Sequence, residues 1–261
     1  AFGEAAIRRI EIDAVGGGKN LLLVRSINDK FSMQEPVQGQ IAATPVSELI
    51  FALAHMEARE FVDEIPEAAG LGDGQGYLAL RVGSNRASTE VGIRLGKENK
   101  DGLVYARREE EDTAVLLPGD VAKKIRRPWL DFVGTQLPKL SVGAYCLEVF
   151  RPQGQKELVY INTDGEWRLE GASADSESHD GVLELADQIR NVRADKALSD
   201  TVIAEGDTGI RLLFRQQPYR NSAVLVEYHM FAHGKYVVLA PPKRAGVVYL
   251  MRRTGIFRRL Y

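Results

Sequence analysis

Several features that often point to a function are scarce in this sequence. Its 261 residues include a single cysteine, Cys146, which excludes an intramolecular disulfide and, in the apolar run Tyr145–Val149, is typical of a buried strand. No apolar run approaches the roughly 18–20 residues that a membrane-spanning helix needs. The formal net charge of −2 and the aromatic content of 8% are ordinary. The composition therefore predicts a globular protein without the overall basicity of a nucleic-acid-binding domain.

Motifs of catalysis and cofactor binding are also missing. The sequence has no Gly-x-Ser-x-Gly elbow and no Ser-x-x-Lys at a helix start. The glycine-rich stretch Gly72–Gly76 precedes an expected strand and lacks the Gly-Lys-Ser/Thr ending of a P-loop, so we interpret it as a connector. The acidic block Glu109–Asp112 lacks the residue order of an EF-hand and is expected to be a solvated hairpin tip. We therefore predict no enzymatic activity, no cofactor and no metal site.

Two histidines, His229 and His233, have the i, i+4 spacing that brings zinc ligands together on a helix. Here they continue an expected strand, in which four residues span roughly 13 Å at ~3.3 Å per residue. We therefore interpret them as a surface pair of a hairpin. His55 and His179, each close to an expected helix, are interpreted as cap or surface residues.

The strongest positive feature is an internal repeat. Residues 7–117 can be aligned with residues 144–250 at an offset that drifts only from 137 to 132. The segment Ile10–Ile12 then falls on Leu147–Val149, and Phe31 falls on Trp167. A repeat of this length predicts two domains, 1–138 and 139–261, each of which buries its own apolar faces.

Alternating apolar and polar residues predict antiparallel strands around one amphipathic helix in each repeat. In the first repeat Thr44 is the expected N-cap and Pro45 the first helical residue. The apolar stripes of the two helices are Val46, Leu49, Ile50, Leu53 and Met56, and Val182, Leu185, Ala186, Ile189 and Val192. The strands expected in the first repeat are Ile7–Ile12, Leu21–Val24, Phe31–Met33, Tyr77–Val82, Val91–Leu95, Leu103–Arg107 and Ala114–Leu117. In the second repeat the four strands after the helix are Ile210–Phe214, Val224–Tyr228, Lys235–Leu239 and Val247–Leu250, with Leu80 aligned on Leu212 and Val115 on Val248. The predicted fold class is α+β, with two tandem repeats that each have a mainly antiparallel sheet and one principal helix.

The order of these features resembles the bacterial domain-of-unknown-function family 4340, in two copies that cover nearly all of the chain. The resemblance depends on Ile10–Ile12, the hairpin that ends in Phe31, the helix that leads into Ala58–Val62, and the segments Gly96-Lys97, Gly102–Arg107 and Val115–Leu117. This family is often found beside gliding-motility-type ABC transporter components. The resemblance implies an extracytoplasmic, non-enzymatic accessory module of the cell envelope, anchored by an N-terminal segment and bound to a permease or related membrane protein.

Basic residues follow the last expected strand of each repeat. After Glu227 the chain has seven basic side chains and no acidic one. We expect an interaction face for an anionic lipid surface or an acidic partner, at about 1 kcal/mol per basic residue near an anionic membrane. A solvated face that pairs with the acidic tracts is the alternative. The candidate residues are Arg252, Arg253, Arg258 and Arg259 in the second repeat and Lys123, Lys124, Arg126 and Arg127 in the first.

One further function class stays open. A ligand- or carbohydrate-binding domain could use a cleft between the repeats, where Trp129, Tyr145 and Tyr160 would stack on a sugar. Nucleic-acid binding through the basic C-terminal segment is disfavoured by the overall charge.

Overall fold

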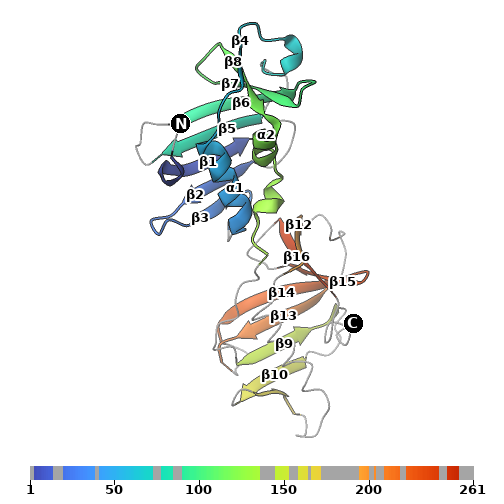
Figure 1. Cartoon of the computed structure of the whole chain (residues 1–261). Helices are drawn as coiled ribbons and strands as arrows, with labels where there is room; N and C mark the ends of the chain where they lie inside the picture. Colours follow the sequence, from blue (N-terminus) through green and yellow to red (C-terminus); the bar gives the residue numbers. More distant parts are fainter. Residues whose placement is uncertain are drawn as a thin grey trace. The chain divides into compact units, whose positions relative to one another are not determined.

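The structure is a computed structural model, and two compact units make up the chain, residues 1–134 and 135–261. The segments that the structure describes are 3–13, 20–38, 41–72, 78–84, 90–135, 145–152, 158–163, 166–171, 194–199, 203, 209–217, 222–240 and 246–252. Each unit is described by itself below. Each contains one eight-stranded sheet in which all printed pairings are antiparallel (Figure 1).

The sheet of the first unit has the strand order β3-β2-β1-β5-β6-β7-β8-β4. Its strands are β1 (Ile7–Asp13), β2 (Leu21–Arg25), β3 (Phe31–Glu35), β4 (Glu60–Val62), β5 (Leu78–Ser84), β6 (Glu90–Glu98), β7 (Leu103–Arg108) and β8 (Ala114–Pro118). The helices of this unit are α1 (Ala43–Ala54), α2 (Gly119–Ile125) and the short 3-10 turns η1 (Glu4–Ala6), η2 (Glu67–Ala69) and η3 (Trp129–Phe132). All seven strands predicted here are present, and the three-residue edge strand β4 was missed.

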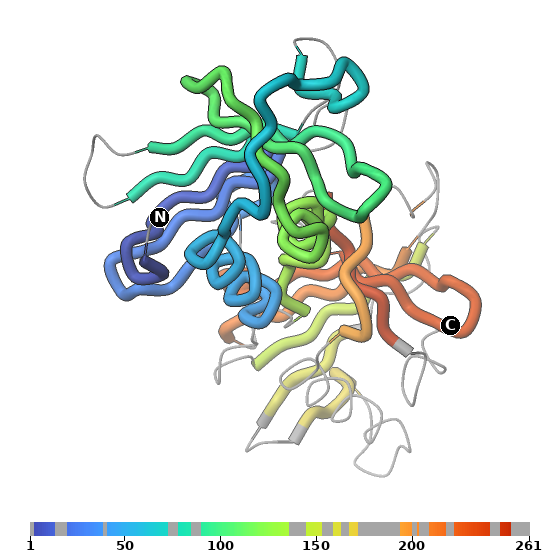
Figure 2. Tube along the Cα trace, turned by 45° about the horizontal axis from the view of Figure 1, so that its top comes forward, coloured from blue at the N-terminus to red at the C-terminus, as the bar shows by residue number. Residues whose placement is uncertain are grey.

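The main core of the first unit lies between the sheet and α1. Figures 1 and 2 show α1 and α2 side by side over one face of the sheet. The predicted stripe of α1 is buried as far as Leu53, because Val46, Leu49, Ile50 and Leu53 lie on one helical face. The alternation in β1 points Ile10 and Ile12 into the same core.

The start of α1 differs from the prediction. The helix begins at Ala43 with Ala42 as the N-cap, so Thr44 and Pro45 lie inside the first turn. The amide of Ala42 donates to the carbonyl of Phe132 at 2.9 Å, and Ile41 forms a bridge with Val133. A tertiary contact with the segment after α2 therefore sets the first residue of the helix.

A smaller core covers one end of the opposite face of this sheet. Ala69, Leu71 and Ala114 are buried together, and Val62, Ile65 and Tyr105 pack against them. The segment that contains η2 passes close to Gly96, where a Cβ atom would meet the carbonyl of Ala69 and the side chain of Leu71. The rest of this opposite face, over β1, β5, β6 and β7, remains partly exposed.

The second unit has the strand order β11-β10-β9-β13-β14-β15-β16-β12, which matches the first when the strands of each unit are counted from its own first strand. Its strands are β9 (Cys146–Phe150), β10 (Leu158–Thr163), β11 (Glu166–Leu169), β12 (Lys196–Ser199), β13 (Ile210–Arg215), β14 (Val224–His233), β15 (Tyr236–Ala240) and β16 (Val247–Arg252). The helix predicted from Val182 to Val192 lies outside the described residues.

The pairing registers also correspond between the units. Ile12 pairs with Leu80 in the first unit, and Val149 pairs with Leu212 in the second, as the aligned positions require. One aligned pair is shifted by a residue. Phe61 pairs with Val115 in the first unit, and Ala197, the residue aligned with Phe61, pairs with Tyr249 rather than with Val248. With Phe61 aligned on Ala197, Val115 corresponds to Tyr249, one residue later than predicted. The structure thus confirms the predicted pair of mainly antiparallel sheets. In the first unit it also confirms the predicted helix, which packs on the sheet.

Candidate functional site

The charged face of the first sheet is the face opposite α1 and α2. We define it by the side chains that alternate away from the core on β1, β5, β6 and β7, and by the residue that follows β7. These are Arg9, Glu11, Asp13, Arg81, Glu90, Arg94, Arg107 and Glu109. Because neighbouring strands are in register, the side chains form rows across the sheet. One row contains Glu11, Arg81 and the glycine Gly92, and the next contains Asp13, Ala79, Arg94 and Arg107.

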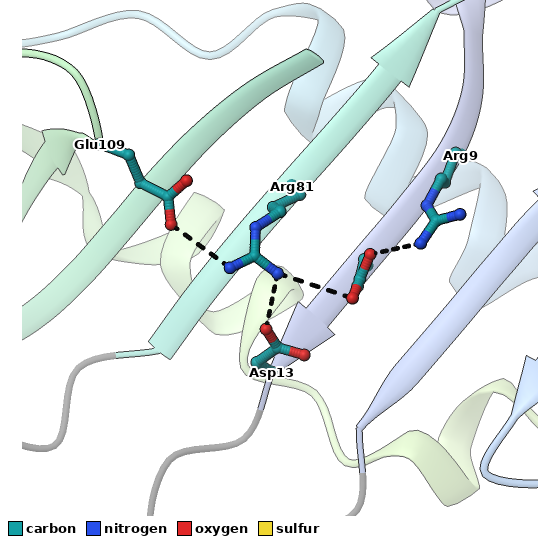
Figure 3. A network of polar contacts seen from close by, with 5 residues as sticks. Arg9, Asp13, Arg81 and Glu109 are labelled. Carbon is teal, nitrogen blue, oxygen red and sulfur yellow. Dashed lines mark hydrogen bonds and ion pairs between the residues drawn. The ribbon is translucent and has the colours of Figure 1, made fainter.

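Arg81 is the centre of an ion-pair network on this face (Figure 3). Its Nη1 donates to Oδ2 of Asp13 at 2.9 Å and lies 3.6 Å from Oε1 of Glu11. Its Nη2 lies 3.6 Å from Oε1 of Glu109. Glu11 in turn accepts from Nη2 of Arg9 at 2.7 Å. Two arginines and three carboxylates are therefore bound to one another across β1, β5 and the end of β7.

The charges in this network hold both arginines in the protonated form. Partial burial lowers the pKa of Arg81, but the attraction of Glu109, Asp13 and Glu11 and the hydrogen bond to Asp13 outweigh it, and the pKa is raised. For Arg9 the hydrogen bond to Glu11 is the largest cause of a raised pKa, opposed by burial. Arg9 and Arg81 are therefore fixed positive charges at neutral pH.

A glycine makes the reach of Glu109 to Arg81 possible. The amide of Glu109 donates to the carbonyl of Gly92 at 3.0 Å, so the chain after β7 still follows β6. The Glu109 carboxylate then passes over Gly92, in the space that a Cβ atom would occupy. The expected solvated hairpin tip is present, since Glu110, Glu111 and Asp112 are exposed, but Glu109 is part of the network rather than of the tip.

Arg94 and Arg107 are directly opposite each other in the next row, on β6 and β7. Like charges at directly opposed positions destabilise a sheet unless something compensates them. Both residues are partly buried. Within the described residues, Arg107 has no carboxylate at ion-pair distance, and its Nε atom is shielded from solvent without a hydrogen-bond partner. Among the described residues, Arg107 therefore has no counter-charge at ion-pair distance.

The corresponding face of the second sheet has a different character. Aligned with Arg9 and Arg81 are Cys146 and Leu213, with exposed fractions of 0% and 6%. Glu148, aligned with Glu11, is only 2% exposed and accepts from Nε of Arg215 at 2.9 Å. The network around Arg81 is therefore not repeated at the aligned positions of the second sheet, although Arg211, Arg215 and Glu227 place other charges on the corresponding face.

Of the eight basic residues proposed from the sequence, the structure describes the side chains of the four in the first unit. Arg126 donates from Nη2 to the carbonyl of Gly96, and Nη2 of Arg127 lies 2.8 Å from Oε2 of Glu48 on α1. Lys123 is exposed and Lys124 is partly exposed on α2. Arg126 and Arg127 therefore connect α2 to β6 and α1, which sequence reasoning missed. Arg252 ends β16, and its side chain is not described; Arg253, Arg258 and Arg259 lie outside the described residues.

Among the described histidines, His55 and His229 have local partners. His229 and His233 both lie on β14 as expected, and Nε2 of His229 is 3.0 Å from Oε1 of Glu227. His55 is the C-cap of α1, its Nδ1 lies 3.0 Å from the carbonyl of Phe51, and the two rings stack at 4.3 Å. His179 and the acidic residues Asp175, Glu177, Asp180 and Glu184 lie outside the described segments.

The three aromatic residues expected in a sugar-binding cleft have different environments. Tyr160 is 6% exposed inside the second unit, which makes it unavailable for stacking on a sugar. Tyr145 is 48% exposed just before β9, and Trp129 is partly exposed at the start of η3. Among the described residues, no group of three or more histidine, cysteine, aspartate or glutamate side chains is arranged to hold a metal ion.

Comparison with models of known protein families, with curated proteins and with solved structures finds no match to this chain. In the part of the chain that the structure describes, no helix has the length and apolar character needed to cross a membrane.

Proposed function

We propose that this protein is a non-enzymatic binding module of the cell envelope that recognises its partner through the charged face of the first sheet. The partner would be a permease or related component of a membrane transport or motility assembly. The setting comes from the resemblance to the family found beside ABC transporter components, and the assignment of the face comes from the geometry.

The observation that supports this assignment most is the contrast between the two sheets. Both have the same strand order, yet Arg81 in the first has its counterpart in the buried Leu213 of the second. If these charges served only folding, an apolar residue at the same place would serve as well, as it does in the second unit. A fixed array of charges favours partner choice and orientation more than it favours stability.

The network also has the properties of a preorganised recognition surface. Each side chain of the Arg81 network is bound to another, so little side-chain entropy is left to be lost on binding. The residues remain accessible, with 34% of the Arg81 side chain and 48% of the Arg9 side chain exposed. Complementary charges on a partner would then fix the register of the contact.

The proposal includes a duplicated origin for the units, in which the second also has one principal amphipathic helix, on Val182–Val192. The equal strand orders and the corresponding pairs Ile12–Leu80 and Val149–Leu212 support it. Duplication explains why one copy could have the buried Leu213 at the position where the other has Arg81.

The test is site-specific photo-crosslinking in cells of the source organism that express the full-length protein. A photoreactive amino acid replaces Arg9 or Glu90 on the charged face, and in matched controls replaces Lys123 or Phe51 on the exposed side of α2 or α1. We expect crosslinks to a membrane transport component from the first pair only. Crosslinks of equal yield from both pairs, or none from the charged face, would contradict the proposal.

A further inference from the structure

We propose that the open edge of strand β4 binds an extended, basic segment of a partner protein, which adds a further strand to the first sheet. The inference goes beyond the proposed function and does not depend on the charged face. Three observations on the described residues support it: an unpaired strand edge, an exposed aromatic side chain on that edge, and an excess of exposed carboxylates around it.

Strand β4 is the last strand at one end of the first sheet (Figure 1). Its residues Glu60–Val62 pair with Ala114–Leu116 of β8, and among the described residues no strand pairs with its other edge. An edge strand presents backbone N–H and C=O groups that can pair with an added strand. The strand is also held in place, because Val62 and Ile65 pack against the small core around Ala69. The edge therefore needs little rearrangement before it binds.

The aromatic side chain on this edge is Phe61, which is 73% exposed. Its partner on β8 is Val115, so the two side chains lie on the same face, and Val115 is itself partly exposed. Charged side chains commonly protect a sheet edge from unwanted pairing, but an exposed ring there has the opposite effect. Strand pairing does not require an aromatic residue, because Ala197, the residue aligned with Phe61, pairs with β16 in the second unit. The ring is therefore available to an added strand.

The charges around β4 define the chemistry of the partner. Between residues 56 and 69 the chain has five acidic side chains and one basic side chain, Arg59. All five carboxylates are exposed, and none of them is within ion-pair distance of a basic side chain in the described segments. A segment with lysine or arginine residues complements this excess of negative charge. The five acidic residues are Glu57, Glu60, Asp63, Glu64 and Glu67.

A second copy of this chain is a poorer occupant of the same edge. If two β4 strands paired with each other, the carboxylates of one copy would lie against those of the other. Like charges at opposed positions destabilise a sheet. In a basic segment, an apolar residue would cover Phe61, and the lysine or arginine residues on either side of it would lie near the carboxylates that flank the ring. The charges thus favour a basic partner over self-association.

The test uses the full chain and, as the probe, a short blocked peptide in which lysine and valine alternate. Fluorescence anisotropy of the labelled peptide measures the affinity, and backbone amide spectra locate the contact. We expect saturable binding with shifts of the amides of β4 and β8. The peptide in which glutamate replaces lysine should not bind. Absence of saturable binding, or shifts confined to other strands, would overturn the proposal.

Two substitutions test the two parts of the contact. F61S removes the ring and E60K reverses one charge, and each should weaken peptide binding about tenfold. Added salt should reduce the effect of E60K, because screening weakens interactions between exposed charges, and should leave the effect of F61S. F61L, which keeps an apolar side chain, should have an intermediate affinity and guards against loss of folding in F61S. Equal affinities of wild type and F61S would contradict the proposal.

The matched controls change the same kinds of side chain elsewhere in the first unit. F51S removes a ring that is 53% exposed on α1. E35K reverses an exposed charge on β3, the strand at the opposite end of the sheet. Both variants should bind the peptide with the affinity of the wild type. Weakening in these controls as large as in F61S and E60K would show that the peptide does not recognise β4.

Sedimentation of the wild type without peptide tests the other occupant of the edge. We expect no self-association through β4, because its carboxylates repel those of a second copy. A dimer that dissociates in F61S would assign the edge to pairing between two copies of this chain and would overturn the proposal of a basic partner.

Discussion

The carboxylate of Glu109 lies over the backbone of Gly92, in the space where any other residue would place its Cβ atom, and from there it reaches Arg81. Gly92 on β6 and Glu109 just after β7 thus have complementary roles, because the glycine lacks a side chain and the glutamate can cross β6 there. The contact extends the network from β1 and β5 to the end of β7. It also shows that glycines within this sheet have separate and testable roles.

Three glycines of the first sheet should respond differently to alanine. At Gly96 a Cβ atom meets the carbonyl of Ala69 and the side chain of Leu71, so we expect G96A to lower the free energy of unfolding by about 1–3 kcal/mol. At Gly92 the obstacle is the end of a flexible glutamate, which can move aside. G92A should therefore cost about 1 kcal/mol or less, the usual value of a partly exposed ion pair.

The matched control for these two variants is G83A. The nearest atom to a Cβ at Gly83 is the Cβ of Arg9 at 3.4 Å, an ordinary contact, and we expect a change within about 0.5 kcal/mol. Urea denaturation measures whether the losses in the free energy of unfolding are largest for G96A and smallest for G83A. A G92A variant as unstable as G96A would show that Glu109 cannot move from its place.

Arg81 should contribute to stability in a salt-dependent way. In R81M the carboxylates of Glu11, Asp13 and Glu109 lose their shared partner and repel one another, so we expect a loss of about 1–2 kcal/mol at low salt. At 1 M salt, where the Debye length is about 3 Å, most of this difference should disappear. R108M, which removes a surface pair with Glu111, should cost at most about 0.5 kcal/mol. A loss in R81M that salt does not change would mean that packing of the arginine stem dominates.

Much of the strand pattern could be predicted because alternation is a local signal. All seven strands predicted in the first unit are present, and Ile10 and Ile12 point into the core as their spacing indicates. The alignment also predicted that Leu80 and Leu212 have equivalent partners, because each copy buries the same face. Local periodicity is therefore a reliable guide where one side of the sheet is buried.

The missing parts depend on contacts that no local pattern contains. The edge strands β4 and β12 are defined by pairing with β8 and β16, which lie much further along the chain. The start of α1 is fixed by the hydrogen bond from Ala42 to Phe132, a residue far along the chain. Arg126 and Arg127 were interpreted as one basic face because they are neighbours in sequence, but tertiary contacts with Gly96 and Glu48 occupy them. The charged face was missed for the same reason, since its row of Arg81 and Glu11 exists only after strand pairing.

The buried pair Glu148–Arg215 should be costly to break from either side. Glu148 is 2% exposed, and Arg215 also donates from Nη1 to the carbonyl of Ser222 at 2.7 Å. In R215M the Glu148 carboxylate would remain buried without a partner, and we expect a loss of about 3–5 kcal/mol. Thermal and urea unfolding of the second unit measure it.

A double-mutant cycle provides the control for this pair. In E148L/R215M both charges are removed together, and the variant should be more stable than R215M alone, because no unpaired charge is left in the sheet. E148Q, which keeps the shape of the side chain, should cost less than R215M. Additive losses in the double variant would show that the two side chains contribute independently.

Tyr160 should make the second unit less stable at alkaline pH. Burial raises the pKa of this tyrosine, and the charge of Arg151 lowers it only in part. The unfolded chain then loses the proton at a lower pH than the folded chain. Stability falls as the pH rises above the ordinary tyrosine value of about 10, because the folded state binds more protons there. Between pH 8 and pH 10.5 the free energy of unfolding, measured by urea denaturation, should decrease in the wild type. In Y160F this decrease should be smaller by on the order of 1 kcal/mol. The phenylalanine variant keeps the ring inside the core, so its stability at pH 8 is the control for packing. An equal decrease in both proteins would assign the alkaline instability to other groups.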